Sequence, residues 1–340
     1  MTLQAAVLGH PIAHSLSPVL HAAAYEHLGL DAEYRRIDVP EESLQDFLRG
    51  AGATGDWMGW SVTMPLKAAM VSVVDRPSAR VRALGVLNTV IHRPAANGEA
   101  SPKSTGLLLG DNTDVDGIVA ALGEAGLHQR PSSAGTFGII GAGATATAAL
   151  AAAAELGFTQ VRSYARSRSR ALELAPVAAA LGLQFSVSEL AALPGDLVPA
   201  AQPGEPAEAA GLDPMGHDVA DPDVANLDVA DPDVVDPDDV SLQAVVSTLP
   251  PRAADELAAT LPRLLHPVPL LDVAYDPWPS ALAQAWGAAG GQVVSGLVML
   301  LHQAVRQVEL FSSGTSTPAE ALSAGSHAEM VAKMRRSIGL

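Results

Sequence analysis

Short apolar runs of strand length alternate along this chain with longer stretches of helical period. This alternation is typical of α/β folds, in which helices connect mostly parallel strands. The pattern runs through the first 114 residues and starts again at Gly135. Because 340 residues can bury two separate cores, we expect two α/β domains with a cleft between them.

The apolar runs and the stretches between them predict individual elements. Strands are expected at residues 5–9, 33–39, 57–63, 86–92, 105–110, 136–140, 160–164, 244–247 and 268–273. Helices are expected at residues 17–28, 41–48, 65–71, 114–125, 146–156, 169–181, 279–289, 296–311 and 318–334. Ser17 should cap the first helix, with Pro18 at its first position.

The net charge of −17 is concentrated in residues 195–240, which hold thirteen Asp or Glu and no Lys or Arg. The rest of the chain is nearly balanced, with 24 acidic and 20 basic residues. A heptapeptide repeated at 218–224 and 228–234 predicts a solvated, low-complexity insertion. Its aspartates lack the glycine turn and final glutamate of an EF-hand, so a calcium site is not expected. Its acidity argues against binding to nucleic acid.

Composition excludes several kinds of protein. The chain has no cysteine, which excludes disulfides, thiolate metal sites and cysteine nucleophiles. It has neither a secretory signal nor an apolar run long enough to span a membrane, so we expect a cytoplasmic protein. The histidines at 10, 14, 21 and 27 lack matching carboxylates, so no metal is expected. Monomer and homodimer both stay open.

The run Gly141-Ala142-Gly143-Ala144-Thr145-Ala146 fits the dinucleotide fingerprint G-x-G-x-x-G/A between a predicted strand and a predicted helix. Gly141 permits the tight turn, Gly143 lets a pyrophosphate approach the backbone, and Ala146 keeps helix and strand close. The phosphates would face the positive end of the helix. We therefore expect a dinucleotide at this turn.

The end of the next strand favours NADP over NAD. NAD sites place an acidic residue there to hold the ribose 2′-hydroxyl. This chain instead has Arg166, Ser167, Arg168, Ser169 and Arg170, without a carboxylate. Guanidinium groups bind phosphate oxygens in pairs, which suits a 2′-phosphate. The alternative is an exposed basic helix start without a ligand.

Lys67 and Asp114 end two short runs that contain hydroxyl or amide side chains, Ser61–Lys67 and Gly110–Asp114, each at the end of an apolar, strand-like run. An ammonium and a carboxylate among hydroxyl and amide side chains suit proton transfer at a small polyhydroxylated substrate. We expect this proton transfer to accompany a hydride transfer involving the dinucleotide.

Together these segments resemble the shikimate dehydrogenase family. The run Gly9–His21 resembles G-x-P-I-x-H-S-x-S-P-x-x-H, Ser61–Lys67 resembles N-V-T-x-P-x-K, and Gly85–Thr89 resembles G-A-V-N-T. The run Gly110–Asp114 is similar to G-x-N-T-D, Leu271–Pro277 to D-x-x-Y-x-P, and Gly296–Gln303 to G-x-x-M-L-x-x-Q. The motifs occur in family order across the chain, except in the acidic insertion and the tail.

The resemblance implies NADPH-dependent reduction of 3-dehydroshikimate to shikimate, a step towards chorismate and the aromatic amino acids. It implies a substrate domain of residues 1–114, completed by helices in 296–340, and a Rossmann-like NADP domain of residues 115–295. Lys67 and Asp114 would be the catalytic pair. The substrate would bind to Ser15, Ser17, Ser61, Thr63, Asn88, Tyr275 and Gln303. NADP would be bordered by Gly141, Ala142, Gly143, Ala144, Thr145, Arg166, Ser167, Arg170, Val273 and Gly296, with Met299 near the nicotinamide.

The sequence departs from the family pattern at four positions. Ser61 and Ala165 stand where Asn is usual, Ala22 replaces an Asn that often follows the motif histidine, and Ala144 replaces a glycine. None of these changes removes a proton donor or a phosphate-binding cation. Two alternatives stay open: an enzyme that also oxidises quinate, and a non-catalytic NADP(H)-binding regulator. The presence of both Lys67 and Asp114 speaks against the regulator.

Overall fold

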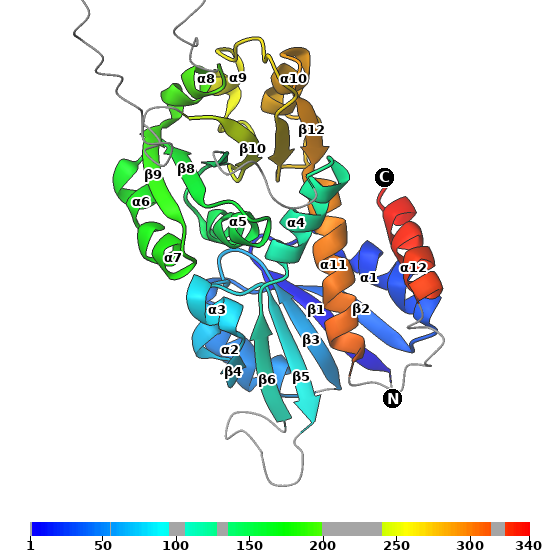
Figure 1. The fold of residues 1–340 in the computed structure, drawn as a ribbon. Coiled ribbons are helices and arrows are strands. Elements are labelled where there is room, and N and C mark those ends of the chain that lie inside the picture. The colour runs from blue at the N-terminus through cyan, green and yellow to red at the C-terminus, as the bar shows by residue number, and fades with distance from the viewer. Residues whose placement is uncertain (1, 55, 95–105, 128–134, 199–239, 314–323) are drawn as a thin grey trace, which may run out of the picture.

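The computed structural model describes all residues except 1, 55, 95–105, 128–134, 199–239 and 314–323. The described chain has two halves, each built on a six-stranded sheet (Figure 1). This arrangement confirms the predicted α/β fold.

The first sheet has the strand order β2-β1-β3-β5-β6-β4. Its strands are β1 (Leu3–Gly9), β2 (Ala32–Asp38), β3 (Trp57–Val62), β4 (Arg76–Pro77), β5 (Thr89–Pro94) and β6 (Gly106–Asp111). The strand β1 is parallel to β2 and β3, whereas β5 runs antiparallel to β3 and β6, so this sheet is mixed. The connecting helices are α1 (Ser17–Leu28), α2 (Leu44–Arg49) and α3 (Ala79–Leu84), with 3-10 turns η1 (Glu41–Ser43), η2 (Ala51–Ala53) and η3 (Ala69–Ser72).

The second sheet is entirely parallel, in the order β12-β11-β10-β7-β8-β9. Its strands are β7 (Thr136–Ile140), β8 (Gln160–Ala165), β9 (Gln184–Glu189), β10 (Leu242–Ser247), β11 (Pro269–Asp272) and β12 (Gln292–Ser295). Its helices are α5 (Ala144–Glu155), α6 (Arg168–Leu172), α7 (Ala175–Ala180), η4 (Leu190–Ala192), α8 (Leu193–Asp196), α9 (Asp255–Ala258) and α10 (Ala281–Ala288). This strand order is that of a doubly wound dinucleotide-binding sheet with β7 as its first strand.

Three helix predictions need correction. The Lys67 carbonyl accepts a hydrogen bond from Leu87 N (3.0 Å), and residues 65–68 form turns that lead into the 3-10 turn η3 instead of an α-helix. The predicted helix 169–181 is divided into α6 and α7, because Pro176 cannot continue the hydrogen bonding of a helix interior and lies in the first turn of α7. Leu16, and not Ser17, is the N-cap of α1, and the Ser17 N–H donates to Ser15 Oγ (3.3 Å).

The strands β4, β9 and β12 and the short helices α3, α8 and α9 were not predicted. All three of these strands lie at sheet edges, where short and partly exposed segments carry little apolar signal. The strand predicted at 86–92 begins only at Thr89. The last predicted helix is described from Ala324 onward, as α12 (Ala324–Ser337). Most of the predicted acidic insertion, residues 199–239, lies outside the described residues.

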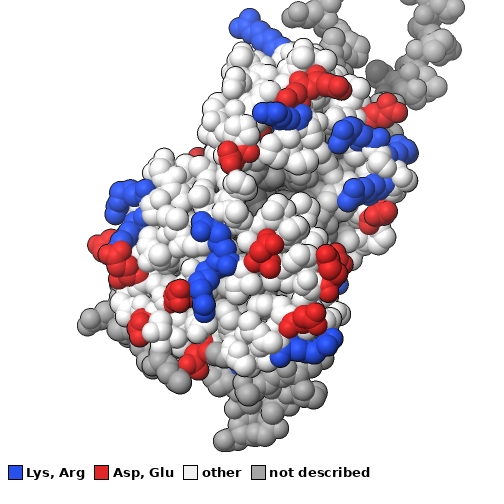
Figure 2. Space-filling model, turned by 180° about the vertical axis from the view of Figure 1, so that it is seen from behind, with Lys and Arg blue, Asp and Glu red and all other residues white. Residues whose placement is uncertain are grey.

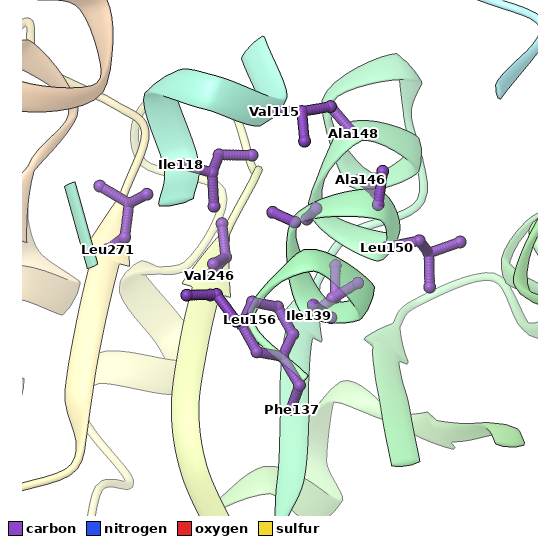
Figure 3. Close-up of a cluster of buried hydrophobic side chains, with 14 of the residues drawn as sticks. Val115, Ile118, Phe137, Ile139, Ala146, Ala148, Leu150, Leu156, Val246 and Leu271 are labelled. Carbon is purple, nitrogen blue, oxygen red and sulfur yellow. The ribbon is translucent and has the colours of Figure 1, made fainter. Parts of the chain in front are cut away.

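Two helices connect the halves. The helix α4 (Asp114–Glu124) leaves the first sheet, and α11 (Gly296–Ser312) returns from the second, and the two pack against each other (Figure 1). Val115 and Ile118 of α4 lie in the core of the second half, in one buried cluster with Phe137 and Ile139 of β7 (Figure 3). The far end of α11 instead packs into the core of the first half through residues such as Phe311. Each crossing helix is therefore held by apolar burial.

Charged side chains of both signs are scattered over the face seen in Figure 2, and neither sign forms a broad patch there. No helix of the described residues is long and apolar enough to cross a membrane.

Gly117 allows the close packing of α4 on α11. A Cβ at Gly117 would lie 2.6 Å from the Met299 carbonyl oxygen and 3.1 Å from the Gln303 Cβ. We expect Gly117→Ala to lower the free energy of unfolding by about 1–3 kcal/mol, the usual cost of overpacking, in urea denaturation. Gly195→Ala is the matched control, because a Cβ there meets nothing within 4 Å. Equal stability of the Gly117 variant and the wild type would contradict the claim that α4 and α11 pack too closely for a Cβ at this position.

Candidate functional site

A cavity of about 330 Å³ lies between the two halves and is lined by residues of both. It contains both predicted catalytic residues, all the predicted substrate-binding residues, and four of those predicted to border the nucleotide. These residues are Lys67, Asp114, Ser15, Ser17, Ser61, Thr63, Asn88, Tyr275, Gln303, Thr145, Val273, Gly296 and Met299. The other predicted nucleotide contacts, at residues 141–144, 166, 167 and 170, lie outside this cavity.

Lys67 and Asp114 form an ion pair inside the cavity. The distance between Lys67 Nζ and Asp114 Oδ2 is 2.5 Å, and the two side chains are only 13% and 9% exposed. Asp114 is the first residue of α4, where a carboxylate is favoured by the helix dipole. The ammonium retains two further hydrogens, because this ion pair uses one. The pair can therefore hold a proton donor beside a bound ligand.

Asn88 fixes the other side of the Asp114 carboxylate. Its Nδ2 donates to Asp114 Oδ1 (2.8 Å) and to Thr113 Oγ1 (3.1 Å). Its Oδ1 accepts from Thr113 N (2.7 Å) and from Thr89 Oγ1 (2.7 Å). Within the protein, Asn88 thus orients the turn that carries Asp114, and its binding to a substrate stays a prediction.

Ser61 belongs to a directed chain of hydrogen bonds. Gln307 Nε2 donates to the Asn88 backbone carbonyl (3.1 Å), which can only accept, so Gln307 Oε1 must face Ser61. Ser61 Oγ therefore donates to Gln307 Oε1 (2.7 Å) and accepts from the Tyr34 hydroxyl (2.6 Å). Because its single hydrogen is used, Ser61 can only accept a hydrogen bond from a ligand.

Tyr34 lies behind the cavity wall and was not predicted from sequence. Its ring stacks on His21 at a centroid distance of 3.9 Å. Burial lowers the pKa of His21 to about 3 and raises the pKa of Tyr34, so both side chains are neutral near pH 7. Gln307 was also missed, although it lies four residues after Gln303 on the same helix, a spacing that places both side chains on one face.

The loop that carries Ser15 and leads into α1 at Ser17 is held by side chains of β2. Arg36 donates from Nε (2.9 Å) and Nη2 (2.6 Å) to the Ser15 carbonyl. His10 Nδ1 lies 2.9 Å from Asp38 Oδ2. Both serine side chains line the cavity opposite the nucleotide-binding half.

Tyr275, Gly296 and Met299 bring the second half to the cavity. Burial, together with Asp276, raises the pKa of Tyr275, so its hydroxyl stays a hydrogen-bond donor. Gly296 begins α11 directly against the backbone of Val273, with no room for a Cβ. This close packing places Met299 at the wall of the cavity one turn later.

The turn after β7 fits a dinucleotide. Gly141 has φ +112°, and a Cβ there would lie 2.5 Å from Thr248 Oγ1, so both conformation and space require glycine. Gly143 differs, because a Cβ would meet nothing of the protein within 4 Å. Protein packing therefore does not explain Gly143, whereas a close-lying pyrophosphate would. Ala146 is fully buried, as expected for close packing of α5 on the sheet.

The arginines in and after β8 have different roles. Arg162 bonds to Asp196 Oδ2 (3.1 Å), and Arg168 Nη1 donates to the Val187 carbonyl (3.0 Å). Among the described residues, Arg166 and Arg170 have no carboxylate partner and are exposed. Ser167 caps α6 by accepting from Arg170 N (3.3 Å). Two free guanidinium groups thus remain beside the dinucleotide turn, fewer than the sequence alone suggests.

Comparisons with known proteins agree with this geometry. The family model of the shikimate dehydrogenase substrate binding domain matches residues 7–90. A shikimate dehydrogenase (NADP(+)) of Methylobacterium radiotolerans is 32% identical over 305 residues, which cover 89% of both chains.

Solved structures with the same fold include two shikimate 5-dehydrogenases. That of Mycobacterium fortuitum is 35% identical, covers 98% of this chain and 97% of its own, and has a TM-score of 0.67. That of Thermus thermophilus, in complex with NADP(H) and shikimate, is 25% identical, covers 98% of this chain and 99% of its own, and has a TM-score of 0.66. On the identity and coverage of these relatives, the chain belongs to the shikimate dehydrogenase family.

Proposed function

We propose that this protein catalyses the reversible, NADPH-dependent reduction of 3-dehydroshikimate to shikimate. The observation that carries the proposal is the Lys67–Asp114 ion pair within a cavity that also reaches Gly296 and Met299 of the nucleotide-binding half. The relatives named as NADP-dependent shikimate dehydrogenases, and the Thermus structure with both ligands, support the same reaction.

The ion pair supplies the proton in this proposal. NADPH, when bound, supplies a hydride to the carbonyl carbon. Lys67 then donates a proton to the carbonyl oxygen as negative charge develops there, and its positive charge stabilises that oxygen before transfer. Asp114, oriented by Asn88, holds the ammonium towards the cavity and can accept from a substrate hydroxyl.

The polar walls orient the substrate. Ser15, Ser17 and Thr63 on one side, with Tyr275 and Gln303 on the other, surround a space suited to a small ring with several hydroxyl groups. Ser61 takes part as a hydrogen-bond acceptor, so we propose that a substrate hydroxyl, and not the carboxylate, faces it.

We propose that the halves are the functional domains. Residues 1–114 contain β1–β6 and would bind the substrate, with α11 and α12 completing that domain from residues 296–340. Residues 115–295 contain the parallel sheet and would bind NADP. Residues 141–145 and Gly296 would hold the phosphates and nicotinamide, and Arg166, Ser167 and Arg170 the 2′-phosphate.

The first test is a set of initial rates with purified protein on shikimate and on quinate, each with NADP and with NAD. We expect turnover of shikimate with NADP, followed by absorbance at 340 nm. Turnover of quinate as well would show that the enzyme is a quinate/shikimate dehydrogenase. Absence of turnover in all four combinations would refute the enzymatic function and favour an NADP(H)-binding regulator.

The second test concerns the 2′-phosphate. A charge-assisted hydrogen bond contributes about 1.5–3 kcal/mol, so Arg166→Ala and Arg170→Ala should each raise KM for NADPH about 10-fold to 100-fold. KM for NADH should stay unchanged, because NADH lacks the phosphate. Arg168→Ala is the matched control, since its guanidinium already bonds to the Val187 carbonyl. An equal rise in KM for NADPH and for NADH would contradict the assignment of Arg166 and Arg170 to the 2′-phosphate.

A further inference from the structure

One guanidinium group of the first half bonds to acceptors on elements that lead into the second half. Arg80, on α3 of the first half, donates from Nη1 to the Asn112 carbonyl (3.0 Å) and to Asp116 Oδ2 (2.6 Å). Its Nη2 donates to Glu155 Oε1 (2.8 Å). The Arg80 side chain is 24% exposed, so these bonds are partly shielded from water.

The three acceptors lie on elements that carry the two parts of the proposed active site. Asn112 lies in the turn that ends at Asp114, and Asp116 lies in the first turn of α4. Glu155 is the last residue of α5, the helix that begins at the dinucleotide turn. Arg80 therefore ties the turn bearing the ion pair to the helix bearing the dinucleotide turn.

The chemistry of arginine suits this junction. A planar guanidinium presents its donors in a fixed fork and can bond to acceptors on two sides at once, whereas a lysine ammonium is a flexible point charge. The Glu155 side chain is 44% exposed, and ion pairs of such exposure add little stability. The Arg80–Glu155 ion pair therefore matters more for the position of α5 relative to the turn at Asn112 than for the stability of the fold.

We propose that Arg80 is a positioning residue for hydride transfer. It fixes the angle between the halves, so that the dinucleotide turn faces the Lys67–Asp114 pair at the reacting distance. This inference rests on the proposed function. Transfer between two bound molecules is sensitive to placement, and a displacement of about 1 Å can lower a rate about 100-fold.

The variants Glu155→Ala and Arg80→Lys test this role. The first removes only the bond from Arg80 to Glu155 of α5 and leaves its bonds to Asn112 and Asp116, and the second keeps the charge but loses the fork. We expect kcat to fall between about 3-fold and 100-fold. We also expect a larger primary deuterium isotope effect with NADPD, because hydride transfer becomes rate-limiting. The Kd of NADPH, measured by fluorescence without substrate, should stay within about twofold, since its predicted contacts all lie on residues other than these two.

Asp196→Ala provides the matched control. It breaks the Arg162–Asp196 ion pair and the hydrogen bond from the Tyr164 hydroxyl to Asp196 Oδ2 (2.7 Å), both of which lie wholly within the second half. It should lower the unfolding temperature without changing the isotope effect. The inference is overturned if Glu155→Ala and Arg80→Lys keep the wild-type kcat and isotope effect, or if they only lower stability or NADPH affinity. An inactive wild-type enzyme would instead refute the proposed function, and the inference with it.

Discussion

The ion pair between Lys67 Nζ and Asp114 Oδ2 is the contact around which the site is arranged. A carboxylate and an ammonium this well buried need partners for their remaining donors and acceptors. Asn88 supplies one, and Thr113, Thr89 and Gln303 hold Asn88 in turn. The polar network therefore extends from the first sheet to α11 and leaves the ammonium directed at the cavity.

The crossing of α4 and α11 determines where this cavity lies. Gly117 lets α11 approach α4 closely, and Gly296 lets α11 begin directly against the backbone of Val273, just after β11. As a result, Met299 and Gln303 of α11 reach the wall of the cavity. The first turn of α4 carries Asp114, while the rest of the helix packs on the second sheet. A chain that crosses twice between two sheets thus places a proton donor of one half beside the nucleotide turn of the other.

The features with local sequence signals were predicted well. The run at Gly141 lies between a strand and a helix as expected, and the runs ending at Lys67 and Asp114 meet in one cavity. The edge strands β4, β9 and β12 were missed because their short, half-exposed sequences lack a clear period. Tyr34 and Arg80 were missed for another reason. Their roles depend on partners 27 and 75 residues away, at Ser61 and Glu155, and no local pattern reports such contacts.

For two of the predicted ligand sites, the structure shows hydrogen bonds within the protein that the sequence did not predict. The arginine cluster at residues 166–170 lost one member to a structural bond, because Arg168 donates to the Val187 carbonyl. Ser61, where the family usually has Asn, became an acceptor within the chain from Tyr34 to Gln307. In both cases, the hydrogen bonds within the protein determine which donors and acceptors remain for a ligand.

The central claim is that Lys67 and Asp114 act as one unit in proton transfer. The most direct measurement is kcat for shikimate oxidation by Lys67→Ala, Asp114→Asn and the double variant. We predict that Lys67→Ala lowers kcat about 10²-fold to 10⁴-fold, and that the double variant is no slower than the slower single variant. Losses that multiply in the double variant would contradict the account, as would a change in KM with unaltered kcat for Lys67→Ala.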